Sequence, residues 1–392
     1  MPAPVAPATR TSIPADAPGR IDAIGLSQHA GDRQVLHGVS LSIESGALVA
    51  IIGGSGAGKT TLLEILAGLR PPSSGQLRYD GAEVAAGSTA GSGIGYVPQD
   101  DILHVEMPLR RTLRYAARLR LPAGVDADEV DRIVDQTLAD LDLAHRADVP
   151  VRQLSGGQRK RASIAVELLT RPRLFFLDEP TSGLDPSTAA EVMAVLRRLT
   201  SSGVTVVLTT HEPASVEQCD QVVVLARDGH LAFTGSPAEA RRYFNVDDIA
   251  DIYTRLATED TLPPEWAEQF EAQRDPVTLQ PPRTATPSRA HGPGAVRQWW
   301  LLTRRNAEVL VRNRLTLAVL LGSPVLVTMM MATLFRRGAF DAATAASLGP
   351  VQVVFWIAFA GFFFGLTYGL LQIVGEQAVF RRERFAGVSV GS

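Results

Sequence analysis

A glycine-rich run at residues 53–61 constrains the fold of this chain more than any other part of the sequence. It reads Gly53-Gly-Ser-Gly-Ala-Gly-Lys-Thr-Thr61, follows an apolar strand-like segment at 48–52, and precedes a helical segment at 62–69. A strand, a glycine-rich turn and a helix N-terminus in this order present backbone N–H groups to a phosphate. The sequence therefore predicts a phosphate-binding loop within an α/β fold. A chance glycine-rich turn is the alternative, and the flanking elements argue against it.

The residues of this run have separate expected roles. Lys59 should reach the β and γ phosphates of a nucleotide, and the Thr60 hydroxyl should hold Mg²⁺. Lys59 is also unusual within the chain, because only two of the 38 lysine and arginine residues are lysines. The residues expected to contact nucleotide are Gly53, Gly54, Ser55, Gly56, Ala57, Gly58, Lys59, Thr60 and Thr61.

Two other apolar strands end in polar residues. Residues 174–177 lead to Asp178 and Glu179, and residues 204–208 lead to Thr209, Thr210 and His211. The carboxyl ends of parallel strands form the ligand edge of such a sheet. We therefore expect Asp178 to complete a magnesium site, Glu179 to act as general base on water, and His211 to touch the γ-phosphate. Each of these residues, taken singly, is more often structural.

The segment Leu154-Ser-Gly-Gly-Gln-Arg-Lys-Arg161 resembles the signature motif of ABC transporter nucleotide-binding domains. Gln99, Asp185 and His211 resemble that family's Q-loop glutamine, D-loop aspartate and switch histidine, and they occur in the family's order. The resemblance implies ATP and Mg²⁺ as cofactors, with Gln99 both at the metal and in catalysis.

The same resemblance implies a homodimer or heterodimer formed through the nucleotide-binding domains. Each ATP would lie between one chain's phosphate loop and the partner's signature motif. A helix start offers backbone N–H groups that suit this second anion site. The residues expected to face the partner's ATP are Ser155, Gly156, Gly157 and Gln158.

Further segments resemble the G subfamily of these transporters. They include Gln99-Asp-Asp-Ile-Leu-His104, Glu167-Leu-Leu169 after the signature motif, and Tyr243-Phe244. An ATPase part that precedes the membrane part is also that subfamily's order. His29 stands where the family usually has an aromatic residue that stacks on adenine. The resemblance implies an enzyme that couples ATP hydrolysis to transport, and we expect export of a lipid or other amphiphile.

Composition divides the chain into five expected parts. Residues 1–20 are rich in proline and alanine and predict a disordered leader. Residues 21–258 alternate strands and helices, which indicates an α/β fold with a mainly parallel sheet; the resemblance implies that they form the P-loop ABC ATPase domain with its helical subdomain. The proline-rich residues 259–294 predict a linker. Residues 295–314 predict a basic amphipathic helix at a membrane interface, and residues 315–392 a partial transmembrane domain.

Two uncharged apolar segments, 315–335 and 351–374, carry the membrane prediction. Each is long enough to cross a hydrocarbon core of about 30 Å, although a pair of buried core helices is the alternative. Arginines before the first and after the second segment place both ends of this hairpin in the cytoplasm, which predicts a multi-pass protein of the plasma (inner) membrane. Two helices cannot enclose a polar pathway. The remaining spans are therefore expected in a missing C-terminal part, which we favour, or in another chain.

The net charge and the cysteine content bear on which classes of function remain possible for this chain. The net charge of −3 gives no support for a nucleic-acid partner, and a single cysteine, Cys219, excludes an intrachain disulfide. A membrane-anchored regulatory ABC ATPase without transport of its own remains open. A non-transport ABC ATPase that acts on a macromolecule fits less well, because the apolar segments point to a lipid bilayer.

Overall fold

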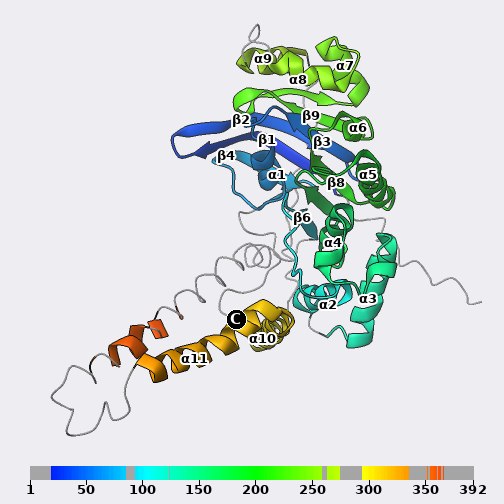
Figure 1. Cartoon of the computed structure of the whole chain (residues 1–392). Helices are drawn as coiled ribbons and strands as arrows, with labels where there is room; N and C mark the ends of the chain where they lie inside the picture. Colours follow the sequence, from blue (N-terminus) through cyan, green and yellow to red (C-terminus); the bar gives the residue numbers. More distant parts are fainter. Residues whose placement is uncertain are drawn as a thin grey trace, which may run out of the picture.

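The computed structural model describes residues 19–84, 93–122, 124–257, 263–273 and 294–334, together with parts of 351–365. Two β-sheets and the helices packed on them form one body, and a group of helices lies below it in Figure 1. The expected leader at 1–20 falls almost wholly outside the described residues.

The first sheet is antiparallel and four-stranded, in the order β2-β1-β4-β5. Its strands are β1 (Ile21–Ala30), β2 (Arg33–Ile43), β4 (Ser74–Tyr79) and β5 (Ala82–Glu83). A short turn at Gly31, whose φ is +62°, joins β1 to β2. This hairpin brings Val35 and Leu36 against the glycine-rich loop.

The second sheet has six strands in the order β10-β9-β3-β8-β7-β6, and all neighbours except β9 and β10 run parallel. Its strands are β3 (Leu48–Gly53), β6 (Ile94–Val97), β7 (Leu174–Leu177), β8 (Thr205–Thr209), β9 (Gln221–Leu225) and β10 (Leu231–Gly235). Strands β3, β7 and β8 are buried along their whole length, as in a sheet covered on both faces. The segments that follow these three strands therefore meet at one edge of the sheet.

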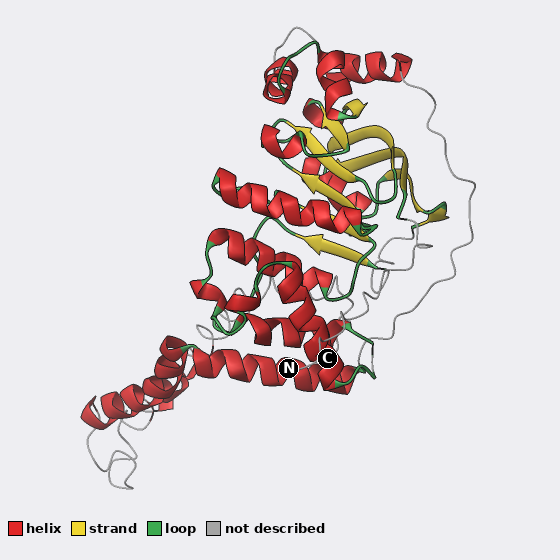
Figure 2. Ribbon diagram, turned by 90° about the vertical axis from the view of Figure 1, so that its right-hand side faces the viewer, coloured by secondary structure: helices red, strands yellow, loops and turns green. Residues whose placement is uncertain are grey.

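Helices cover both faces of this sheet (Figure 2). Helix α1 (Lys59–Leu66) contacts strands of both sheets through Leu62, Leu63, Ile65 and Leu66. The other covering helices are α5 (Pro186–Ser201), α6 (Pro213–Val216), α7 (Pro237–Phe244) and α8 (Ile249–Ala257). The turn η3 (Arg227–Gly229) packs against β2.

The expected helical subdomain consists of α2 (Leu109–Arg120), α3 (Ala127–Asp140) and α4 (Gly156–Leu168), with the short helices η1 (Ala144–Arg146) and η2 (Val151–Gln153). A buried ion pair joins α2 to α4, in which Arg120 donates to both carboxylate oxygens of Glu167 at 2.7 and 3.1 Å. Because this pair is bidentate and hydrogen-bonded, it fixes the relative position of the two helices.

The linker expected at 259–294 contains a packed helix, so that expectation is wrong for its first part. Helix α9 (Pro263–Gln273) lies on β10 and buries Trp266 and Phe270. Its two prolines occupy the first helical turn, where a missing N–H is tolerated. The aromatic anchors outweigh the proline-rich composition from which the linker was inferred. Residues 274–293 lie outside the described part of the chain.

Two helices follow, α10 (Ala295–Arg312) and α11 (Arg314–Leu334), and α10 lies beside α2 (Figure 1). Among the described residues no single helix combines the length and hydropathy of a membrane span. Helix α10 and residues 316–329 meet that test together, as a pair bent by 77°. Most of the second expected span, 351–374, lies outside the described residues. The two expected spans are therefore not confirmed.

Candidate functional site

The glycine-rich loop connects the end of β3 to the start of α1, as the sequence predicts. Gly56 and Gly58 have φ values of +76° and +87°, in the left-handed region that favours glycine. A Cβ atom at Gly58 would lie 2.8 Å from the Val35 carbonyl oxygen, so the β1–β2 hairpin leaves no room for a side chain there. This close packing explains why glycine is needed at that position.

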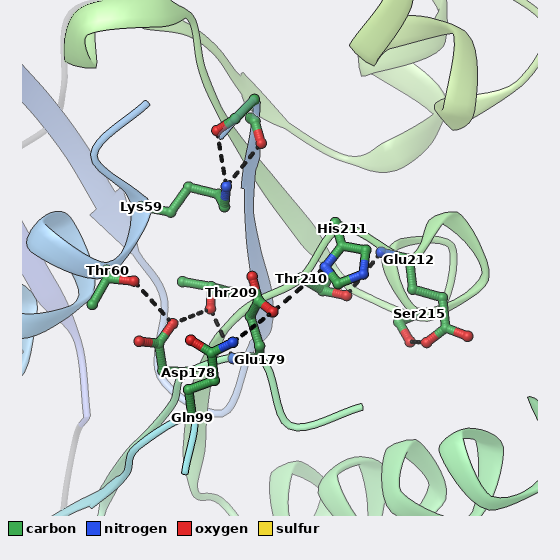
Figure 3. A network of polar contacts seen from close by, with 12 residues as sticks. Lys59, Thr60, Gln99, Asp178, Glu179, Thr209, Thr210, His211, Glu212 and Ser215 are labelled. Carbon is green, nitrogen blue, oxygen red and sulfur yellow. Dashed lines mark hydrogen bonds and ion pairs between the residues drawn. The ribbon is translucent and has the colours of Figure 1, made fainter. Parts of the chain in front are cut away.

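The ammonium of Lys59 lies across the loop. It donates hydrogen bonds to the carbonyl oxygens of Gly53 and Gly54, at 2.9 and 3.0 Å (Figure 3). Burial lowers the pKa of Lys59, and the carboxylates of Glu179 and Asp178 oppose that shift. The loop thus holds a partly desolvated cation beside its backbone N–H groups, which is an arrangement suited to an anion.

Asp178 lies at the end of β7, and only 5% of its surface is exposed. Its Oδ1 accepts hydrogen bonds from the hydroxyls of Thr209, at 2.6 Å, and Thr60, at 3.2 Å. Neighbouring ligands of an octahedral Mg²⁺ stand about 3 Å apart and are hard oxygens. The Thr60 hydroxyl and the Asp178 carboxylate therefore fit a magnesium site in spacing and in chemistry.

The third expected metal ligand, Gln99, contacts Glu179. Its Nε2 lies 3.4 Å from Oε2 of Glu179, toward which it can donate. No cluster of three or more His, Cys, Asp or Glu side chains suited to a metal occurs in the described parts of the chain. A cation at Thr60 and Asp178 would thus need further oxygen ligands from a bound phosphate or from water.

The Glu179 carboxylate contacts side chains from two other segments of the chain. Its Oε2 lies 3.4 Å from Nε2 of Gln99 and 3.6 Å from Nδ1 of His211. Glu179 has a φ of +46°, which is uncommon for a residue with a side chain and turns it away from the strand direction. Thr209 holds this turn, because its hydroxyl accepts the Glu179 N–H at 2.9 Å.

His211 follows β8, and 62% of its side chain is exposed. The main chain before it is held from α8, where the Tyr253 hydroxyl donates to the Thr210 carbonyl at 3.3 Å. Burial, and next the charge of Glu179, raise the pKa of Tyr253, so this hydroxyl stays a donor at neutral pH. No sequence pattern points to Tyr253. Thr209 could have been noted as a hydroxyl at the end of a buried strand.

The signature segment begins α4 and lies apart from the phosphate loop. Ser155 is the N-cap of this helix: its hydroxyl accepts the Gln158 N–H at 3.3 Å, and the Gln158 side chain accepts the Ser155 N–H at 3.2 Å. In the described residues, the side-chain hydrogen bonds of this pair join only the two residues to each other. Among the described residues, none of these hydrogen bonds involves the phosphate loop at 53–61 of the same chain.

Gly157 has a structural reason to be glycine. A Cβ atom there would lie 2.0 Å from Cγ2 of Thr188, so a side chain at this position would force Thr188 of α5 to move. Asp185 caps α5 by accepting from the Thr188 N–H at 3.1 Å and from the hydroxyls of Ser187 and Thr188. These hydrogen bonds hold the pKa of Asp185 well below its usual range.

Comparison with known proteins agrees with this geometry. Residues 36–182 match the family model described as ABC transporter. An ABC transporter ATP-binding/permease protein of Mycobacterium tuberculosis is 36% identical over 376 residues, which cover 92% of this chain and 42% of that protein. ABC transporter G family member 21 of Arabidopsis thaliana is 40% identical over 228 residues, which cover 56% of this chain and 34% of that protein. The chain thus spans less than half the length of each of these relatives.

Two solved structures share the fold of the ATPase-like part. One is cbiO1 of Clostridium perfringens, described as part of an ABC transporter complex, with a TM-score of 0.53 and 31% identity over 58% of this chain and 92% of that one. The other is an ATP-binding cassette in a dimeric post-hydrolysis state bound to ADP and Pi, with a TM-score of 0.50 and 25% identity over 55% of this chain and 98% of that one. The P-loop ABC ATPase fold expected from the sequence is confirmed.

Proposed function

This chain belongs to the ABC transporter family as an ABC-type ATPase, and we propose that residues 21–258 bind ATP with Mg²⁺ and hydrolyse it to power transport across a membrane. The observation that carries the proposal is the polar network at the edge of the second sheet. There the Lys59 ammonium, the Thr60–Asp178 oxygen pair and the Glu179 carboxylate lie side by side (Figure 3).

In the proposed reaction a water oxygen attacks the γ-phosphorus and the bond to the β–γ bridging oxygen breaks, which gives ADP and phosphate. Glu179 accepts the proton of the attacking water, while Gln99 and His211, both within 3.6 Å of its carboxylate, orient that water. Lys59 offsets the charge that develops on the phosphate oxygens. Mg²⁺ bound at Thr60 and Asp178 would supply further positive charge at the same oxygens.

We place the second half of each ATP site on a partner chain. Ser155 and the first turn of α4 offer N–H groups at an ordered helix N-terminus. Within the residues that the structure describes, the side chains of Ser155 and Gln158 make no hydrogen bond to the loop at 53–61 of their own chain. The solved cassette described as dimeric and bound to ADP and Pi supports this arrangement. Homodimers and heterodimers are both compatible with it.

The membrane part is proposed from exposure and composition. Helix α11 leaves large apolar side chains open, for example Leu321 at 65% and Met329 at 69%. Exposed apolar area costs roughly 25 cal/mol per Å² in water, so a lipid bilayer is the natural environment for such a helix. Trp299 and Trp300 on α10 are also exposed, which suits a helix at the membrane interface.

We therefore propose that residues 295–314 form an interfacial helix, and that 315–335 and 351–374 are the first two spans of a transporter of the plasma (inner) membrane. The ATPase domain would lie in the cytoplasm. The remaining spans would come from a continuation of the chain or from another chain. The proposed cargo is a lipid or another amphiphile, carried outward, as the resemblance to the G subfamily implies.

Replacing Lys59 with alanine tests the ATPase proposal. The Lys59→Ala full chain, purified in detergent, should lose tight ATP binding and hydrolysis, because the loop loses the cation that faces the phosphates. Arginine is not a conservative control, since a planar guanidinium does not replace a compact ammonium. Hydrolysis by Lys59→Ala at the parent rate would show that the site lies elsewhere.

A further inference from the structure

The second lysine of the chain, Lys160, lies inside the protein. Only 4% of its surface is exposed, and its Nζ donates to the Gln99 carbonyl oxygen at 2.8 Å. Asp101 Oδ1 lies 3.4 Å from the same nitrogen and supplies a counter-charge. In a chain that otherwise uses arginine, both lysines thus donate to main-chain carbonyls at the candidate site.

A buried ammonium is costly unless it is paired and hydrogen-bonded. At this place the contact calls for a compact donor, because Nζ lies 2.8 Å from the Gln99 carbonyl oxygen and the side chain that carries it is buried. An ammonium provides three rotatable donors on a flexible stem, whereas a guanidinium needs room for a planar fork. The choice of lysine therefore fits the geometry of this contact.

Lys160 connects two parts of the site that are otherwise far apart in the sequence. It belongs to α4, the helix that Ser155 caps and that is proposed to face the partner's ATP. Gln99, whose main chain it holds, reaches Glu179 through its own side chain at 3.4 Å. A continuous path therefore runs from the N-terminus of α4 through Lys160 and Gln99 to the Glu179 carboxylate.

We propose that Lys160 is a positioning residue that couples the two ATP sites of the dimer. Nucleotide bound by the partner's loop at the start of α4 would set the position of that helix. When α4 moves, Lys160 would move the Gln99 main chain with it. The Gln99 side chain would then reposition the Glu179 carboxylate in the ATP site of the same chain. The proposal rests on the composite site proposed above, and it predicts ATP hydrolysis with positive cooperativity.

A purely structural role is the competing explanation, and the chain offers two matched controls. Arg120→Met breaks another buried ion pair of the helical subdomain, the one with Glu167, without touching Gln99. Asp101→Asn removes the counter-charge of Lys160 and leaves its hydrogen bond to the Gln99 carbonyl. The test variant is Lys160→Met, which keeps an unbranched side chain that is one atom shorter and removes the donor.

The experiment compares these variants of the full chain in detergent. Amide hydrogen exchange is followed in peptides that cover residues 99–104 without nucleotide, and ATPase activity is measured over a range of ATP concentrations. Lys160→Met should speed exchange in that segment, bring the Hill coefficient to 1, and lower kcat about tenfold, within the range of mutations along a coupling path. The KM for ATP should change less than about twofold, because ground-state binding by the Lys59 loop is untouched.

Arg120→Met should keep the parent's cooperativity and its exchange at 99–104, even if it lowers the melting temperature. Asp101→Asn should keep the parent's cooperativity, because Lys160 still donates to the Gln99 carbonyl; its exchange at 99–104 is not compared, since residue 101 lies in that segment. The proposal is overturned if Lys160→Met keeps the parent's Hill coefficient and exchange, if the parent is not cooperative, or if either control reproduces the losses of Lys160→Met. The ATPase proposal fails in a different way. In that case the parent hydrolyses no ATP, while Lys160→Met can still loosen residues 99–104.

Discussion

At the scale of single residues, the proposed hydrolysis of ATP depends on one carboxylate. Glu179 is the only residue whose carboxylate contacts both Gln99 and His211 in the described part of the chain, and its backbone is held in an uncommon conformation to do so. Asp178, one position earlier, accepts hydrogen bonds from two threonine hydroxyls and is suited to hold a metal. The two neighbouring carboxylates therefore have different proposed roles because their surroundings differ.

Glu179→Gln keeps the shape of the side chain and removes the base. Turnover should fall on the order of 10²-fold or more, the usual contribution of a general base, while ATP and Mg²⁺ still bind. The variant should therefore accumulate as a nucleotide-bound dimer, which light scattering can follow in detergent. Normal turnover would show that Glu179 is not the general base, and His211 would be the next candidate for that role.

Thr209→Val removes the hydroxyl that joins Asp178 to the Glu179 N–H. Because Thr209 is fully buried, both partners would lose a hydrogen bond without gaining water, at a cost of about 1–3 kcal/mol in the free energy of unfolding. ATPase activity should fall as well, since Glu179 loses its anchor. Thr209→Ser keeps the hydroxyl and serves as the control. Equal stability and activity in Thr209→Val and the parent would show that the anchor is dispensable.

At the scale of elements, the close approach of α4 to α5 can be tested on its own. Gly157→Ala places a methyl group against Cγ2 of Thr188 and should destabilise the fold by about 1–3 kcal/mol, as overpacking does. Adding Thr188→Ser removes that methyl carbon and keeps the hydroxyl that Asp185 accepts from. Thermal unfolding should therefore show rescue in the double variant. Strictly additive losses would mean that the two residues are not in contact.

The helices and strands also show how much of the fold and of the candidate site could be predicted from the sequence. The strand–loop–helix unit at 48–69 and the polar strand ends at Asp178 and His211 were predictable, because short-range patterns encode them. Helix α9 was not predicted, since the tertiary burial of Trp266 and Phe270 outweighs a local composition rich in proline. Tyr253 was missed because its contact with the Thr210 carbonyl joins segments that have no pattern in common.

At the scale of the whole molecule, the central claim is that each ATP is enclosed by two chains. The phosphate loop and the start of α4 belong to one body, yet the hydrogen bonds of Ser155 and Gln158 do not extend to residues 53–61. We propose that the apolar side chains exposed on α11 mark where that body would meet lipid. Dimerisation and membrane attachment would together place two ATPase domains face to face at one membrane surface.

Mixing two inactive variants tests this claim most directly. Lys59→Ala damages the phosphate loop, and Ser155→Arg should block the partner's γ-phosphate with a bulky charge, so each homodimer has two damaged sites. In a head-to-tail heterodimer one site carries both defects and the other carries neither. The mixture should regain ATPase activity in proportion to the fraction of heterodimer, measured by crosslinking. Heterodimers without activity would exclude two sites that can each hydrolyse ATP independently. A fully active Ser155→Arg protein alone would contradict the claim that each ATP is enclosed by two chains.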